Sequence, residues 1–249
     1  MFLRTDMIGT SDYIYWFFNY VFAGTTATIV SGAVAERCQF RAYLIYSFAL
    51  AGFIYPVASH WIWDSSGFLN GRVYDFAGGG AVHMVGGVAA AIGSVILGPR
   101  KGKFVKIEGS RKKQAIEIPA HNMTLAVLGV LILWFGFFAF NGGSSYTIAG
   151  EAQFNATGRA VVVTTLGGAF GGIVTMLWGY LVTGAWKLDW TINGLLGGMV
   201  SRMSFSKNET LEYMAFFLKI NEYLCCLFSC YIRLLHVPVQ MHWNHGGGL

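Results

Sequence analysis

The chemistry that this chain could perform centres on one histidine inside an apolar segment. His83 lies in the stretch DFAGGGAVHMVGGVAAAIG, where an ionisable side chain is costly and usually faces a cavity or a polar partner. A neutral imidazole at such a depth could bind or relay a proton without burying a charge. The alternative is a histidine that bonds to a neighbouring helix for packing. Position alone does not separate the two interpretations.

A carboxylate and two tryptophans stand where apolar segments begin or end. Asp75 comes just before the third apolar segment, where it could cap a helix or place a negative charge that favours cations. Trp63 ends the second apolar segment, with Trp61 close by. A tryptophan in such a place is either an interfacial anchor or an aromatic partner for a small cation. The spacing leaves both pairs of alternatives open.

Five aromatic residues crowd the stretch WFGFFAFNGGSS, directly before two glycines and two serines: Trp134, Phe135, Phe137, Phe138 and Phe140. Phenylalanines at the end of a membrane span can form a hydrophobic constriction. Ser144 could then offer a hydroxyl next to it. The competing interpretation is that these rings face lipid.

Five stretches without Asp, Glu, Lys or Arg are long enough to carry these residues across a membrane. They are Tyr13–Ala35, Ala42–Trp63, Phe76–Pro99, Met123–Gly150 and Ala160–Trp186. A helix needs about 20 apolar residues to cross the bilayer core. The sequence therefore predicts an all-α, polytopic transmembrane helix bundle rather than a soluble protein with five buried helices.

Composition agrees with this fold class. Of 249 residues, 55% are hydrophobic and only 12% are charged, whereas an ordinary soluble domain carries about 25% charged residues. The 33 glycines include small-residue pairs four positions apart that let helices approach closely. These pairs are Gly86/Ala90, Gly87/Ala91, Gly167/Gly171 and Gly168/Gly172.

The placement of the basic residues predicts an orientation. The connection Arg100–Glu117 holds seven Lys/Arg against two Glu, which is typical of a cytoplasmic loop. Arg37, Arg41 and Lys187 must then lie on the same side, and the N-terminus lies outside. The net charge of +5 is thus explained by membrane orientation, and nucleic-acid binding is not expected.

A sixth span begins near Thr191, but the sequence changes character at Ser201. We expect a membrane domain over residues 1–200 and a divergent tail over 201–249, which holds Cys225, Cys226 and Cys230. No cysteine spacing typical of a metal site is found. No nucleotide-binding, hydrolase or metalloprotease motif is found either. We therefore predict no enzyme activity, cofactor or metal.

Together these segments resemble the ammonium transporter family (Amt/Mep/Rh), in particular its eukaryotic Amt branch. The stretches that carry the resemblance are FAGTTATIVSGAVAERCQF, YPVASHWIWDSSG, YDFAGGGAVHMVGGVAAAIGSVILGPR, HNMTLAVLGVLILWFGFFAFNGGSS and INGLLGGMV, in this order along about Tyr13–Val200. The combination of GAVAER, DFAGGGAVH and WFGFxxFNxGS is highly specific.

The resemblance implies a role for each residue of the candidate site. Trp63, Ser144 and Phe22 match residues that form an outer site for ammonium. Phe22 and Phe140 match a stacked gate below it. Asp75 matches an aspartate that supports helix geometry and electrostatics without touching the substrate. His83 matches the first of two histidines that line the pore.

The resemblance also implies an eleven-helix protomer in the plasma membrane, assembled as a trimer with one hydrophobic pore per subunit. Recruited NH4+, or methylammonium, would lose its proton before crossing. Measured against this pattern, the chain looks like a central fragment, since two leading helices, the last three helices and the second pore histidine have no match. The alternative function is a non-transporting membrane protein that associates with full-length paralogues. A membrane-embedded enzyme using His83 is disfavoured, because no nucleophile shares its depth.

Overall fold

A computed structural model describes residues 13–106, 113–116, 118–146 and 148–201 of the chain, and the predicted tail lies outside them except for Ser201. Its elements, in chain order, are α1 Tyr13–Val34, α2 Phe40–Ala49, η2 Leu50–Ile54, α3 Tyr55–Trp63, η3 Gly79–Met84, α4 Val85–Leu97, β1 Phe104–Lys106, β2 Lys113–Ala115, α5 Met123–Gly143, α6 Glu151–Thr183 and α7 Leu188–Val200. The segments η2 and η3 are π-helical and continue into α3 and α4.

In this part of the chain, five helical segments are long and apolar enough to cross a membrane. The second consists of α2, η2 and α3, and the third of η3 and α4. The predicted polytopic helix bundle is therefore confirmed. Most of the side chains that are exposed in the isolated chain are large and apolar, as expected for helices that face lipid.

Several predicted boundaries were wrong. The third helical segment begins at Gly79 rather than Phe76, and α5 ends at Gly143 rather than Gly150. The fifth membrane-spanning helix begins at Glu151 and includes Arg159, which lies ahead of the charge-free stretch Ala160–Trp186. The reason is that a stretch without charged residues indicates which part of the chain lies in the apolar core of the membrane. The ends of a helix are decided by its caps and by the turns beside it.

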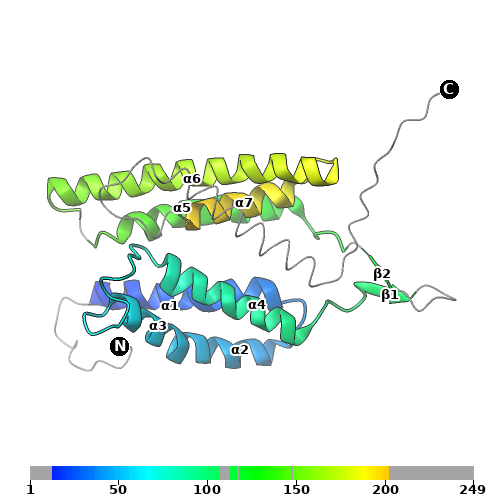
Figure 1. The fold of residues 1–249 in the computed structure, drawn as a ribbon, viewed down its shortest axis with the longest axis horizontal. Helices are drawn as coiled ribbons and strands as arrows, with labels where there is room; N and C mark the ends of the chain where they lie inside the picture. Colours follow the sequence, from blue (N-terminus) through cyan, green and yellow to red (C-terminus); the bar gives the residue numbers. More distant parts are fainter. Residues whose placement is uncertain (1–12, 107–112, 117, 147, 202–249) are drawn as a thin grey trace.

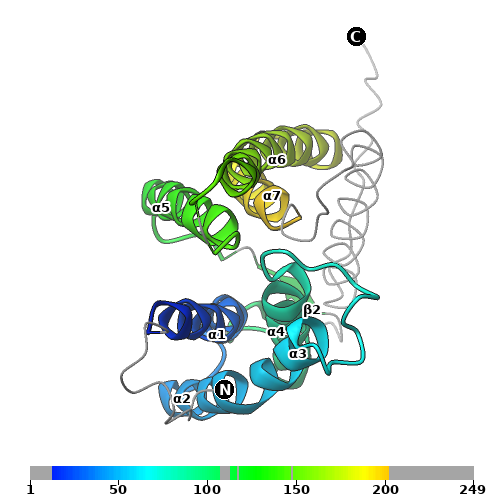
Figure 2. The same cartoon turned by 90° about the vertical axis from the view of Figure 1, so that its left-hand side faces the viewer.

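The helices form two groups (Figures 1 and 2). One group holds α1 to α4, in which α1 packs along α4, and the other holds α5, α6 and α7, in which α6 and α7 make the most extensive contact. A two-stranded antiparallel hairpin, β1 with β2, projects at one end of the bundle (Figure 1). The sequence did not predict this hairpin, whose strands are only three residues long.

Glycine accounts for the close contact between α6 and α7. A Cβ added at Gly194 would lie 2.5 Å from the carbonyl oxygen of Gly171, and one added at Gly168 would lie 3.0 Å from Met199 Cγ. Gly86 likewise packs against Ile29 of α1. Gly87 does not follow the expected pattern, because it faces open space.

Candidate functional site

Two stacked phenylalanine rings join the two helix groups. The rings of Phe22, from α1, and Phe140, from α5, have centroids 4.0 Å apart and are nearly parallel at 11°. Phe22 is 3% exposed and lies in a small core cluster with Tyr55 and Val82. The stack is therefore a closed apolar contact rather than a lipid-facing one.

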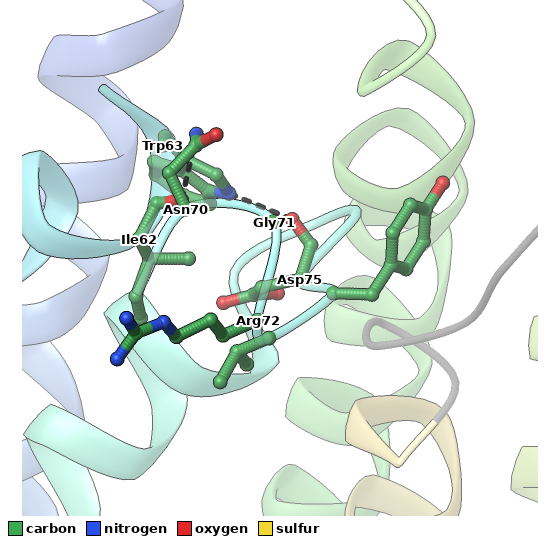
Figure 3. Close-up of a pocket in the computed structure, with 8 residues that line it drawn as sticks. Ile62, Trp63, Asn70, Gly71, Arg72 and Asp75 are labelled. Carbon is green, nitrogen blue, oxygen red and sulfur yellow. Dashed lines mark hydrogen bonds between the residues drawn. The ribbon is translucent and has the colours of Figure 1, made fainter. Parts of the chain in front are cut away.

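Trp63, the last residue of α3, lies on one side of this stack. Its ring meets Phe22 edge-on, with centroids 6.0 Å apart. The indole Nε1–H donates a 2.6 Å hydrogen bond to the backbone carbonyl oxygen of Asp75 (Figure 3). Because this bond fixes the ring, Trp63 is held by the loop that follows α3 and is not a free interfacial anchor.

Asp75 organises that loop. Its carboxylate accepts four backbone N–H bonds of 2.8 Å, one each from Gly78, Gly79, Gly80 and Ala81. Gly78 has a positive φ of 89°, which turns the chain after it so that the next N–H groups point back towards the carboxylate. These are the free donors at the start of η3, so the side chain caps this helix across a short turn. A carboxylate offers about four acceptor positions, and here all of them are used.

A cavity of about 360 Å³ lies over the stack, and we call it the aromatic cavity. Its lining residues are Phe22, Trp63, Tyr74, Asp75, Phe76, Ser144 and Tyr146. The Ser144 hydroxyl donates to the carbonyl oxygen of Phe140 at 2.7 Å, which leaves the hydroxyl oxygen able to accept. A neighbouring pocket of about 320 Å³, drawn in Figure 3, shares Trp63, Tyr74 and Asp75 with it.

His83 lies on the other side of the stack, within the π-helical turn η3. The centroid of its ring lies 5.7 Å from that of Phe140, which it meets edge-on, and 5.8 Å from that of Phe137, to which it is tilted by 34°. Its Nδ1 lies 3.3 Å from the Gly78 carbonyl oxygen, and its backbone N–H donates to the same oxygen at 3.0 Å. Four rings therefore follow one another in contact, from Trp63 through Phe22 and Phe140 to His83.

The structure thus brings all six predicted site residues together, and it adds Tyr74, Phe76 and Tyr146, which the sequence analysis missed. Tyr146 follows the two serines that come directly after α5, and the sequence offers no other sign of its place in the site. Within the described ranges, no three His, Cys, Asp or Glu side chains gather as a metal site would require. The three clustered cysteines and the last three histidines lie outside those ranges.

These features define a class of protein: a polytopic helical membrane protein with an aromatic cavity over a stacked phenylalanine pair. The model of the Ammonium Transporter Family matches residues 2–215 of the chain. The chain therefore belongs to this family. The match extends on both sides beyond the stretch Tyr13–Val200 on which the resemblance rested.

Relatives with curated names support the same assignment. The chain is 42% identical over 206 residues to ammonium transporter 1 member 3 of Solanum lycopersicum, which covers 76% of this chain and 44% of the relative. It is 43% identical over 209 residues to ammonium transporter 1 member 1 of Oryza sativa subsp. japonica, with 76% and 41% covered. The chain thus spans less than half the length of these relatives.

Two solved structures share the fold. A sensor Amt protein superimposes with a TM-score of 0.66 at 32% identity, over 77% of this chain and 47% of that one. Mep2 of Saccharomyces cerevisiae superimposes with a TM-score of 0.60 at 28% identity, over 74% and 38%.

Proposed function

We propose that this chain supplies the recruiting site and the gated part of a pore for ammonium transport across a membrane. The observation that carries the proposal is the continuous series of ring contacts from Trp63 through Phe22 and Phe140 to His83. It leads from a cavity that suits a small cation to a histidine beyond an apolar constriction.

The aromatic cavity has the chemistry to hold NH4+ or methylammonium. The face of Trp63 attracts a cation electrostatically, and the Ser144 oxygen accepts one of its N–H groups. Asp75 does not act as a ligand, because its acceptor positions are filled by backbone donors. Its negative charge still favours a cation in the cavity that it helps to line.

The stack of Phe22 and Phe140 separates the cation from the rest of the path. Moving an ion through an apolar constriction is prohibitive, whereas neutral NH3 passes with far lower cost. The ammonium ion in the cavity therefore gives up its proton to the water outside, which leaves NH3, and this neutral molecule crosses the stack when the rings move apart. His83 then provides a neutral polar contact on the far side.

Orientation and assembly belong to the same proposal. The aromatic cavity faces the outside, because the basic connection between α4 and α5 lies at the opposite end of the spans and marks the cytoplasmic side. In this orientation the N-terminus lies on the outer side of the plasma membrane. The chain works as one subunit of a trimer, which is formed with its own copies or with paralogues.

Uptake of radiolabelled methylammonium by cells that lack their own ammonium transport tests this function. Cells expressing this chain should take up the probe, and Phe22→Ala or His83→Ala should abolish uptake. Phe135→Ala is the matched control, since this ring lies on the same helix as Phe140 but is 77% exposed; it should leave uptake unchanged. No uptake by the wild type, or equal uptake by all variants, would contradict the proposal.

A second candidate function is association with full-length paralogues without transport by this chain. Exposed apolar side chains along α1, among them Ile14 at 78% and Phe17 at 60%, can contact a paralogue as well as lipid. A full-length paralogue co-expressed with this chain should then co-purify with it and show lower flux. Failure to co-assemble would remove this candidate.

A further inference from the structure

Tyr146 is held in a backbone conformation that its own turn does not need. It is the only non-glycine residue with a positive φ, 61°, in the described part of the chain. Bulky side chains rarely adopt this region, and the strain concentrates at functional sites. The turn is closed by the Tyr146 backbone N–H, which donates to the Gly143 carbonyl oxygen at 2.9 Å. A glycine or asparagine would make the same bond with less strain.

The conformation places the tyrosine ring at the aromatic cavity. Tyr146 lines the cavity together with Phe22, Trp63 and Ser144. The residue is 52% exposed, so the ring lies at the rim, with one part towards the cavity and another towards the surroundings.

Neighbouring rings hold Tyr146 in place. Its centroid lies 5.2 Å from that of Phe18 and 5.6 Å from that of Tyr15, both on α1. Phe18 in turn lies 4.5 Å from Phe22 of the stack. Burial, and to a lesser degree the neighbouring Tyr15, raises the pKa of the Tyr146 phenol above its ordinary value. The ring is therefore neutral over the physiological range and presents a π-face rather than a negative charge.

We propose that Tyr146 is a further cation-binding residue of the aromatic cavity, with a ring that supplies a second aromatic face beside that of Trp63. The inference rests on the proposed function, since it takes ammonium or methylammonium as the ligand. A tyrosine face attracts a small cation within about 6 Å of the ring centroid.

The inference is tested by equilibrium binding of radiolabelled methylammonium to the purified full chain in lipid nanodiscs. Unlabelled ammonium chloride is the competitor, and sodium chloride at equal ionic strength is the salt control. Tyr146→Phe keeps the ring and should bind as the wild type does. Tyr146→Leu keeps much of the bulk without a π-face and should bind about two- to fivefold more weakly. Tyr146→Gly relieves the backbone strain while removing the ring, so its expected loss of affinity does not arise from misfolding.

Two further variants make the outcomes distinct. Tyr20→Leu is the matched control, since Tyr20 is 53% exposed and packs on Trp16 but does not line the cavity; it should bind normally. Trp63→Leu tests the site itself.

If the wild type shows no competable binding, the proposed function fails and the inference with it. If Trp63→Leu abolishes binding while Tyr146→Leu and Tyr146→Gly bind normally, only the inference fails, and Tyr146 is a packing residue. Weaker binding by Tyr146→Phe would also overturn the π-face assignment, in favour of the hydroxyl.

Discussion

The four hydrogen bonds on the Asp75 carboxylate predict that Asp75→Asn strongly destabilises the protein. The side chain is 7% exposed, and each bond is 2.8 Å long. Asparagine keeps one acceptor oxygen but places an NH2 group against two of the four backbone donors. Two charge-assisted bonds are lost, and each contributes about 1.5–3 kcal/mol. The expected loss of stability is therefore about 3–6 kcal/mol.

Thermal unfolding of the purified chain in detergent, followed by far-ultraviolet circular dichroism, measures this loss. For a chain of this size, 3 kcal/mol lowers the midpoint by roughly 6–12 °C. The matched control is Asp64→Asn, because Asp64 lies in an exposed turn where it bonds to Ser66; its midpoint should hardly change. If Asp75→Asn unfolds at the wild-type temperature, the four bonds add no net stability. The role of Asp75 would then lie in its charge alone.

Two other predictions concern packing and pH. Gly194→Ala should weaken the packing of α7 on α6, because the added Cβ would meet the Thr175 side chain. Limited proteolysis should then cleave the variant faster than the wild type. In the control Gly24→Ala the added Cβ meets open space, so the rate of proteolysis should not change. Hydrogen bonds from Ser66 lower the pKa of Asp64. Because this carboxylate is exposed, its contribution to the stability of the fold is small; it is present above the ordinary carboxyl range and is lost as the pH falls through the lowered pKa. Ser66→Ala should raise the Asp64 pKa, as followed by carboxyl-carbon NMR; an unchanged pKa would contradict this assignment.

The sequence predicted the membrane helices well because the bilayer imposes a simple rule on them. A segment that crosses the apolar core must avoid charge over about 20 residues, and such runs are visible without any knowledge of packing. The absence of charge does not predict the residue at which a helix is capped. Asp75 illustrates the limit: its position ahead of an apolar run indicated a cap, but the turn that sets the helix start at Gly79 requires the positive φ of Gly78.

The candidate site could be predicted only where its residues lie in recognisable stretches. Trp63, Phe140 and Ser144 stand in such stretches, so the resemblance identified them together. Tyr146 stands outside them, and its importance depends on a backbone angle and on rings from α1 that are more than a hundred positions away in the sequence. No local pattern predicts a contact of that kind, because it arises only when the two helix groups meet.

Under the proposed function, the loop from Asp75 to Gly78 would serve both helix capping and the recruitment of the cation. The Asp75 carbonyl oxygen holds the Trp63 indole on one side of the stack. The Asp75 carboxylate holds the Gly78 N–H, and the Gly78 carbonyl oxygen in turn accepts the backbone N–H of His83 and lies beside its Nδ1. The same four-residue turn thus positions the groups on both sides of the phenylalanine pair. A substitution that disturbs this turn must therefore disturb Trp63 and His83 together, whereas one in the stack removes a ring contact and keeps the hydrogen bonds of the turn.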